Sequence, residues 1–556
     1  MTGEQIMHLV AMGVYMTIVI VIGLLFAKRA NKSSDDYLLG GRSLGPWVTA
    51  FSASASDMSG WLLMGLPGVA YWCGLADATW TAIGLAVGTY LNWLIVSKRL
   101  RRYSVRANNS VTLPDFFSNR FREKKKVIMM ISAVFILIFF TVYAASCFVT
   151  CGKLFATLFG FSYIPMMIIG AVFVLVYTIL GGFLAESASD FMQAIVMIIA
   201  LVTVLIVGVV SAGGVGAIVE NSQSIPGFFE FFGQASPVTN EGTQIAVNGS
   251  PVFGVAKEYG LLSVCSALAW GLGYFGMPQV LLRFMAIRKE KELKASRRIA
   301  IIWIVVSLAV AVFIGIMGRT LFPTHEVLAT KGGAESIFIT ITTTVFDSGL
   351  LPILAGFIMA GILAATISSS DSYLLIAASS FSKNIFQGVM HKKASDRAVM
   401  WATRITLGVI AIIAILLALD ENSVIFELVS FAWAGFGATF GPLMLFSLFW
   451  KRITKAGAVA GMISGGAMVF IWKLLISQLG GAFAIYELLP AFIISSIVIV
   501  VVSLLTKKPS AEIEADFEAV KNGEVEDVYA SADAEAEAQT VAEESAEVES
   551  DEAVEE

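Results

Sequence analysis

The sequence has few charged residues and few of the side chains on which most enzymes depend. Only 14% of its 556 residues are charged, whereas water-soluble domains are about a quarter charged. There are three histidines, and they lie far apart at His8, His325 and His391. This spacing argues against a histidine metal site or a catalytic triad.

Cysteine is equally scarce, and no cysteine pair has the flanking partners of a zinc or redox motif. We therefore expect buried structural thiols at the four positions, Cys73, Cys147, Cys151 and Cys265. Because no nucleophile and base pair and no cofactor motif is present, we expect a protein that is not an enzyme and has no cofactor. Nothing indicates a nucleic-acid partner.

Long apolar runs dominate the sequence instead. Hydrophobic residues make up 57% of the chain and the mean hydropathy is +0.80, so the expected solvent is a lipid bilayer. A hydrocarbon core of about 30 Å needs about 20 apolar residues in a helix. Scanning for such runs predicts an all-α membrane protein of about thirteen spans, at 6–27, 45–72, 77–97, 127–150, 162–182, 190–213, 254–285, 299–321, 336–380, 398–418, 424–449, 456–477 and 484–506.

Basic residues fall in alternate loops when thirteen spans are threaded. The positive-inside rule then predicts an outer N-terminus and a cytoplasmic C-terminus. The first run is followed by lysine and arginine without a small-residue cleavage site, so we expect it to be retained. The basic loops are 28–42, 98–126, 288–298, 383–397, 451–455 and 507–508.

The chain divides into a transmembrane domain, residues 1–506, and an acidic tail, residues 507–556. The tail is rich in Ala, Glu and Asp and poor in aromatics, which is typical of a disordered segment; a docking helix is the alternative. The outer loop at about 214–257 is polar and gives no indication of its role.

The second run is interrupted by hydroxyls and by Asp57, a carboxylate at membrane depth. Such a carboxylate normally faces a cavity or a partner, so Asp57 is a candidate functional residue. The alternative is a purely structural hydrogen-bond network.

The seventh run contains three glycines and Pro278 within two turns, which predicts a discontinuous helix. Trp270 and Tyr274, four residues apart, would share one helical face and offer a solute an aromatic wall with a polar tip. Tight helix packing at the glycines is an equally weighted alternative.

The ninth run is too long for one simple crossing and carries a dense hydroxyl cluster, including the adjacent Ser368 and Ser369. Sodium prefers oxygen ligands from hydroxyls and from carbonyls freed where a helix unwinds. The alternative is that these serines bond to carbonyls of their own helix. Asp371 is either part of the cluster or solvated near the inner helix end.

Broken helices at matching positions are typical of carriers with inverted repeats. Spans two and seven are both first helices if the repeat is five plus five. We therefore expect core repeats at about 45–213 and 254–449, with a helix before the core and two after it.

Several motifs together resemble those of the sodium/solute symporter family, and most closely those of its bacterial proline carriers. The resemblance covers residues 7–505, and the motifs are DDYLLGGRSLG at 35–45, SDMSGW at 56–61, GGFLA at 181–185 followed by Asp190, WGLGYFG at 270–276 and RFMA at 283–286. It implies sodium-coupled import of L-proline across the bacterial cell membrane by alternating access.

The resemblance also implies site residues. Sodium would lie between spans two and nine, bound by the carbonyls of Ala55, Met58 and Ala365 and the hydroxyls of Ser368 and Ser369. The residues implied in coupling are Asp57, Ser59 and Gly60, and those implied in proline binding or its gate are Tyr143, Trp270, Tyr274 and Pro278.

The motif around Pro278 departs from the family's proline carriers, with Met277 and Gln279 where Gln and His are expected. Ser369 stands where threonine is frequent. Other solutes of the family, such as pantothenate, sugars, carboxylates or choline-like compounds, therefore remain alternatives, followed by a transport-like sensor and a channel.

Overall fold

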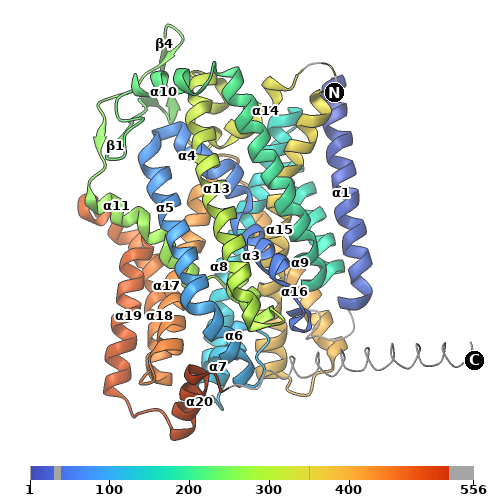
Figure 1. The fold of residues 1–556 in the computed structure, drawn as a ribbon, viewed down its shortest axis with the longest axis vertical. Coiled ribbons are helices and arrows are strands. Elements are labelled where there is room, and N and C mark those ends of the chain that lie inside the picture. Colours follow the sequence, from blue (N-terminus) through green and yellow to red (C-terminus); the bar gives the residue numbers. More distant parts are fainter. Residues whose placement is uncertain (1, 31–38, 348, 350, 525–556) are drawn as a thin grey trace, which may run out of the picture.

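The computed structural model describes residues 2–30, 39–347, 349 and 351–524 of the chain, which form a bundle of long helices (Figure 1). Residues 35–38 of the first motif and the tail beyond residue 524 lie outside the described residues. The helices are α1 (Gly3–Ala30), η1 (Gly40–Arg42), α3 (Pro46–Gly60), η2 (Trp61–Gly65), α4 (Leu66–Cys73), α5 (Leu75–Leu91), η3 (Asn92–Val96), α6 (Ser97–Arg106), α7 (Leu113–Arg120), α8 (Val127–Phe159), α9 (Tyr163–Ser211), α10 (Val215–Gln223), α11 (Leu261–Leu268), η4 (Ala269–Phe275), α12 (Pro278–Ala286), η5 (Glu290–Glu292), α13 (Leu293–Leu321), η6 (Glu326–Leu328), η7 (Gly333–Ser336), α14 (Ile337–Val345), α15 (Leu351–Ser379), η8 (Ser380–Met390), α16 (Asp396–Leu417), α17 (Ile425–Phe449), α18 (Lys455–Ile471), η9 (Trp472–Ile476), η10 (Ser477–Leu479), η11 (Gly481–Phe483), α19 (Leu488–Leu505) and α20 (Ala511–Asn522).

Within the described residues, ten helices are long and apolar enough to cross a membrane, or eleven if the bent pair Leu261–Phe275 and Pro278–Ala286 is one span. Two of the thirteen expected spans are outside this count. The second consists of three shorter helices, α3, η2 and α4, and the fifth corresponds to the short apolar segment Tyr163–Ile179. The count of thirteen therefore stays a prediction.

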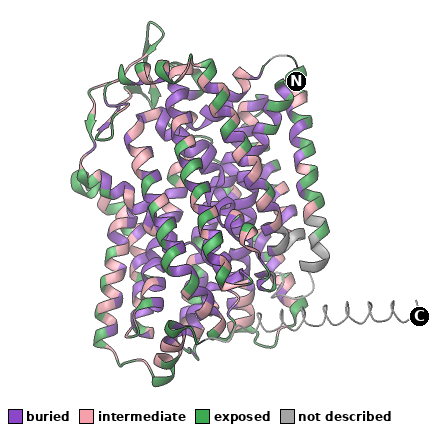
Figure 2. Cartoon of the chain, viewed as in Figure 1, coloured by how far each residue is buried: buried purple, intermediate pink, exposed green. Residues whose placement is uncertain are grey.

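The surface of the bundle is suited to lipid. Exposed apolar side chains follow one face of α16, at Ile405, Val409, Ile412 and Leu416, where a soluble helix would carry charges. Buried residues fill the middle of the bundle, and exposed ones lie on its outer faces and in its loops (Figure 2).

Helix α9 contains two expected spans in one continuous stretch. The hydroxyls of Tyr177 and Ser189 are 2.6 Å apart although the residues are 12 positions apart, and this separation is about 18 Å along a straight helix. The helix therefore bends sharply between them, and the bend separates Tyr163–Ile179 from Glu186–Ser211. The ninth expected span is also divided, because α14 ends at Val345 before α15 begins at Leu351.

Both helices that were expected to be broken are broken. Ser59 interrupts α3 with φ +46° and ψ −168°, and the seventh span changes from α11 through the 3₁₀ turns of η4 to α12. The two broken spans meet where α12 contacts α3, whereas η4 packs against the neighbouring helices α5 and α17.

At the outer end, the loop between α10 and α11 forms three short antiparallel pairs. These are β1 (Gly233–Gln234) with β6 (Lys257–Glu258), β2 (Thr239–Asn240) with β3 (Thr243–Gln244), and β4 (Ala246–Val247) with β5 (Ser250–Pro251). The loop is fastened to the bundle by backbone hydrogen bonds from Leu75 to Phe228 and from Ala235 to Cys73.

At the opposite end, part of the tail that was expected to be disordered forms helix α20. Its Phe517 and Val520 are buried, and its Asp516 pairs with Arg106 at 2.9 Å and with Arg122 at 2.8 Å. The structure differs from the expectation here because an apolar pair spaced for one helical face and the acidic residues beside it match a basic, aromatic surface. The average composition of the tail conceals this short segment.

Candidate functional site

The site is built around the break in the second span. The left-handed φ of Ser59 is uncommon for a residue other than glycine, and its hydroxyl accepts a hydrogen bond from the freed backbone N–H of Trp61 at 3.2 Å. The next residue, Gly60, has no room for a side chain, because a Cβ there would lie 2.4 Å from Cγ2 of Thr150 on α8. The break thus lies against α8, with backbone groups displaced from the regular helical ladder.

Four of the five predicted sodium ligands meet where α3 contacts α15. The Ser368 hydroxyl donates to the carbonyls of Ala55 at 3.0 Å and Ala365 at 3.1 Å, and the Ser369 hydroxyl donates to Ala55 at 3.3 Å. All four residues are buried. The carbonyl of the fifth, Met58, accepts the N–H of Trp61 at the break.

The neighbouring hydroxyl behaves as the alternative interpretation expected. Ser370 donates back to its own helix, to the carbonyl of Thr366 at 2.6 Å. Ser368 and Ser369 differ from it because their hydroxyls reach across to another helix.

The carboxylate of Asp57 faces the other broken span. It accepts hydrogen bonds from the Tyr274 hydroxyl at 2.6 Å and from the Gln279 amide at 3.4 Å. The backbone carbonyl of Asp57 accepts from the Tyr143 hydroxyl at 3.3 Å. Asp57, Tyr143 and Tyr274 are therefore brought together, and Gln279 joins them.

Trp270 lies within a cluster of aromatic rings. Its ring centroid is 5.0 Å from that of Tyr486, 5.1 Å from Phe426, 5.6 Å from Trp61 and 6.1 Å from Trp433. The Trp433 indole also donates to the carbonyl of Trp270 at 2.7 Å. The prediction missed the rings other than Trp270, because they come from distant segments and nothing in their local sequence indicates their partners.

The prediction that Trp270 and Tyr274 share one helical face is wrong. Residues 269–275 form a 3₁₀ helix, in which residues four apart differ by about 120° in direction instead of the about 40° of an α-helix. Trp270 accordingly faces the ring cluster while Tyr274 reaches Asp57, and both rings still lie near Trp433.

Pro278 is the first residue of α12, a position at which its missing N–H costs nothing. The glycines before it serve packing as well as the break. A Cβ on Gly271 would lie 2.2 Å from the carbonyl oxygen of Gly84, and one on Gly276 would lie 2.3 Å from that of Phe436. The segment is therefore discontinuous, as predicted, and also closely packed at its glycines, whereas the role of its aromatic side chains toward a solute stays a prediction.

A buried charged cluster lies beside the site, and no role was predicted for it. Arg283 donates to Glu186, to Asp190 at 3.2 Å and to the hydroxyls of Ser52 at 3.0 Å and Ser372 at 2.9 Å. The signal was present, because Asp190 and Arg283 belong to two of the quoted motifs. Their pairing depends on the contact between α9 and α12, which local sequence does not indicate.

Asp371 lies in this region and is 1% exposed, so the solvated alternative for it is wrong. One of its carboxylate oxygens accepts from the backbone N–H of Ser372 at 2.8 Å.

Comparison with known sequences identifies relatives over nearly the whole chain. Residues 37–465 match the model of the sodium:solute symporter family. The chain is 41% identical over 511 residues to a protein named sodium/proline symporter from Escherichia coli K12, and 40% identical over 519 residues to one of the same name from Staphylococcus aureus USA300. Each match covers 92% of this chain and 95% of the relative.

Solved structures share the fold at lower identity. A Na⁺-coupled sialic acid symporter in a substrate-bound outward-open state superposes with a TM-score of 0.71 at 18% identity, covering 91% of this chain and 99% of the other. Mhp1, a transporter of the nucleobase-cation-symport-1 family, gives a TM-score of 0.50 at 13% identity over 88% of this chain and 99% of its own. These likenesses confirm the predicted fold class, an all-α membrane protein with an inverted-repeat core, and with the sequence matches they place this chain in the sodium:solute symporter family.

Proposed function

We propose that this protein is a multi-pass carrier of the bacterial cell membrane that imports L-proline together with sodium. The family match and the two relatives named sodium/proline symporter support the solute and the ion. The observation that carries the proposal within the molecule is the convergence of Ala55, Ala365, Ser368 and Ser369 beside a broken helix.

Sodium binds to the oxygens of these four residues and of Met58. A cation that leaves water loses the water oxygens around it, and fixed oxygen dipoles of the protein must replace them. Hydroxyls and carbonyls provide such dipoles and carry no positive charge that would repel the ion. Ion binding would replace the hydrogen bonds from Ser368 and Ser369 to Ala55 and so change how α15 holds α3.

Proline binds one step along the same helix. Asp57 lies two residues after Ala55, and its carboxylate, with the hydroxyls of Tyr143 and Tyr274, suits the solute's ammonium group. The ring of Trp270 suits the apolar carbons of the pyrrolidine ring. Because α3 contributes to both sites, the ion and the solute each favour the same arrangement of the break at Ser59 and Gly60, and this is the proposed coupling.

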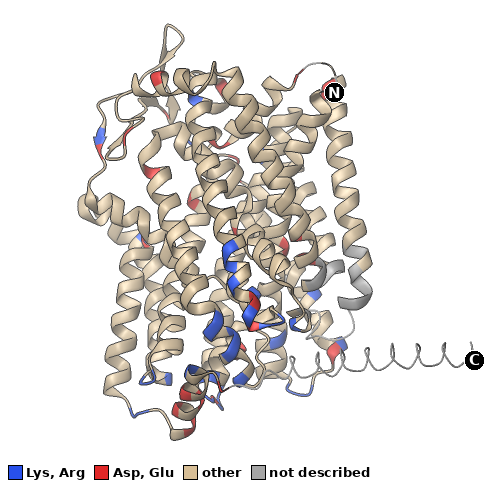
Figure 3. Cartoon of the chain, in the orientation of Figure 1, with Lys and Arg blue, Asp and Glu red and all other residues tan. Residues whose placement is uncertain are grey.

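The N-terminus faces outward and the C-terminus lies in the cytoplasm. Lys and Arg gather at the end of the bundle that carries α6, α7 and α20, opposite the N-terminus (Figure 3). The positive-inside rule favours a cytoplasmic position for that end.

The test is uptake of radiolabelled solutes into proteoliposomes under an imposed sodium gradient. Proline should accumulate, and replacement of external sodium by choline should abolish the accumulation. Pantothenate, a sugar, a carboxylate and a choline-like compound serve as comparison solutes. Equal proline accumulation without the gradient would refute the coupling, and preferred uptake of another solute would refute the substrate.

A further inference from the structure

A long apolar groove lies on the outer surface of the bundle, where α8 faces α16. Its volume is about 570 Å³, and residues of α8, η8 and α16 line it, among them Ile138, Val142, Phe381, Ile405, Val409 and Ile413. Four of these side chains, Ile138, Ile405, Val409 and Ile413, are 40–63% exposed. The groove therefore opens at the surface that lipid would surround.

The groove suits a hydrocarbon chain in polarity and in length. Its two hydroxyls, those of Thr141 and Thr406, donate to carbonyls of their own helices at 2.6 and 2.8 Å. The lining on α16 runs from Ile405 to Leu417, which is about 18 Å along a helix. Half of the hydrocarbon core of a bilayer is about 15 Å, so one acyl chain of one leaflet matches the wall.

A positive charge lies at one end of the groove. Arg404 immediately precedes Ile405, and its guanidinium lies 5.7 Å from the ring centroid of Trp401, which comes one turn earlier on α16. Arg404 is half-buried, its Nε is buried without a hydrogen-bond partner among the described residues, and no described carboxylate forms an ion pair with it. A charged group within a membrane span normally has a partner, so Arg404 is suited to pair with an anion that reaches it from the lipid.

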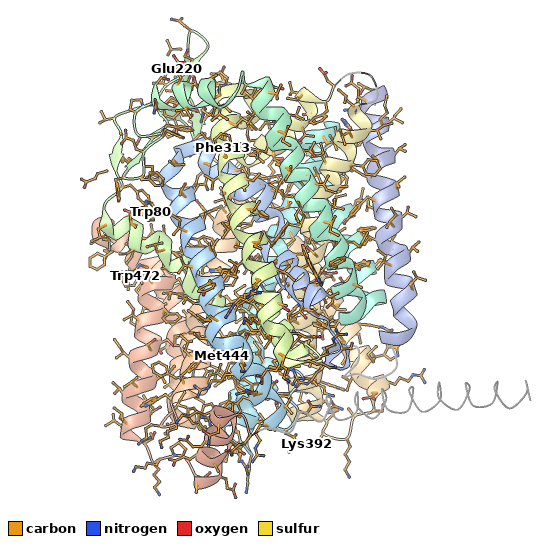
Figure 4. All side chains as sticks on the ribbon, viewed as in Figure 1. Trp80, Glu220, Phe313, Lys392, Met444 and Trp472 are labelled. Carbon is orange, nitrogen blue, oxygen red and sulfur yellow. The ribbon has the colours of Figure 1, made fainter. Side chains whose placement is uncertain are left out.

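The position of Arg404 along α16 suits the headgroup region. α16 has 22 residues and is about 33 Å long, slightly longer than the hydrocarbon core. Arg404 lies about 12 Å from the start of α16, and helical side chains point toward the N-terminus of their helix, so its guanidinium lies closer to that end. Lys392, in the loop before α16, lies at the end of the bundle where Lys and Arg gather (Figure 3 and Figure 4).

We propose that this groove binds an anionic phospholipid, with the phosphate at Arg404 and one acyl chain between α8 and α16. A guanidinium donates two parallel hydrogen bonds to a phosphate, and the phosphate supplies the counter-charge. Trp401 lies where the headgroup meets the chain, as tryptophans at membrane interfaces do. This site is separate from the proposed sodium and proline sites and does not depend on the proposed transport.

The test is equilibrium binding of radiolabelled dioleoyl phosphatidylglycerol to the purified full-length protein in detergent. Wild type should bind one such lipid per chain saturably. Phosphatidylcholine with the same chains should compete more weakly, because its own cation neutralises its phosphate. Arg404→Gln should lower the affinity about tenfold, as expected for lost hydrogen bonds to a charged group. Arg404→Lys keeps the charge without the paired hydrogen bonds and should lie between the two.

Two variants of exposed apolar residues test the groove itself. Val409→Trp places a large ring in the groove and should lower the affinity about tenfold, comparable to the loss of contacts by about two methylene groups. Ile412→Trp is its matched control, because Ile412 is 61% exposed on the same helix and does not line the groove. Its affinity should equal that of wild type. Thermal unfolding checks that both variants remain folded.

Arg297→Gln is the matched control for the charge. Arg297 is also half-buried, and its guanidinium lies 5.8 Å from the ring centroid of Tyr90. It belongs to α13, which contributes no residue to the lining of the groove. Its replacement should therefore leave the affinity for phosphatidylglycerol unchanged.

The outcomes are distinct. Equal affinity of wild type, Arg404→Gln and Val409→Trp would mean that the lipid forms an unselective layer around the protein, and this would overturn the site. A loss in Arg297→Gln or Ile412→Trp as large as in its counterpart would overturn it too. Displacement of the lipid by an equal concentration of inorganic phosphate would indicate a site for free phosphate and overturn the assignment to a lipid. None of these results bears on proline uptake.

Discussion

Helices α3 and α15 carry two polar clusters about one turn apart, and the clusters are built on opposite principles. Ser52 and Ser372 belong to the first, where the guanidinium of Arg283 meets Glu186 and Asp190. Ala55 and Ser368 belong to the second, where neutral oxygens meet. The first contains its own cation, and the hydrogen bonds that the structure gives to Ser368 and Ser369 in the second go to neutral carbonyls.

This difference separates a fixed structural element from a place for an exchangeable ion. A buried charge that loses its partner is strongly destabilising, so the guanidinium of Arg283 has to stay paired with its carboxylates. Hydrogen bonds from neutral hydroxyls to neutral carbonyls cost less free energy to break, so a sodium ion can replace them and leave again. The same two helices can therefore be held together by Arg283 and be adjusted by sodium one turn away.

The largest expected effect comes from breaking the charged cluster. Arg283→Ala leaves Glu186 and Asp190 buried without their counter-charge and should cost about 3–5 kcal/mol of stability. Thermal unfolding of the purified protein measures this loss. Lys521→Ala, which removes a cation that pairs with Glu518 of the same helix at 3.3 Å, is the control. A loss below about 1 kcal/mol, as for an exposed pair, would show that the two clusters do not differ as described.

The second prediction concerns the neutral cluster. Replacing both Ser368 and Ser369 by Ala removes two sodium ligands and should raise the sodium concentration for half-maximal uptake about 100-fold, at roughly 1.4 kcal/mol for each ligand. The fold should survive because no charge is left unpaired. Sodium titration of uptake measures the effect.

Ser370→Ala is the matched control for this pair. Its hydroxyl bonds to Thr366 of its own helix, so its removal should leave the sodium dependence nearly unchanged. If Ser370→Ala were as damaging as the double change, the assignment of the neutral cluster to sodium would be wrong.

The third prediction separates the solute from the ion. Tyr274→Phe removes the 2.6 Å hydrogen bond to the Asp57 carboxylate and should weaken apparent proline affinity about tenfold. Tyr143→Phe, which loses only a 3.3 Å bond to a neutral carbonyl, should have a smaller effect. Competition binding measures both. A larger change in sodium affinity than in proline affinity for Tyr274→Phe would place Tyr274 with the ion.

The sequence predicts those parts of this arrangement that have a local signal. Glycines, Pro278 and Asp57 within apolar runs indicated the broken spans, and adjacent serines indicated the oxygen cluster. What it could not predict depends on contacts between distant segments. The ring cluster around Trp270 and the pairing of Arg283 with Asp190 join helices far apart in the chain. The direction of Trp270 relative to Tyr274 depended on whether the turn was α or 3₁₀, which the glycines left open.

The smallest expected effect comes from ion pairs that are exposed to solvent, in contrast to the buried cluster of Arg283. In α20, the ion pairs of Asp516 with Arg106 and Arg122 involve arginine side chains that are 45% and 48% exposed, so salt should screen them. Phe517, by contrast, is buried and lies near the guanidinium groups of Arg99 and Arg120. Asp516→Asn should therefore weaken the docking of α20 by up to about 1 kcal/mol at low salt, and by less at high salt. Phe517→Ala should weaken it more, and equally at both salt concentrations, because burial of an apolar ring is not screened.

Hydrogen exchange of the backbone amides in 511–522 measures both effects, as a loss of protection of up to about fivefold for Asp516→Asn. Lys521→Ala, which leaves the bundle contacts intact, should change little. If the effect of Asp516→Asn did not depend on salt, its ion pairs would have to be counted with the buried cluster of Arg283, and exposure would not be what distinguishes them.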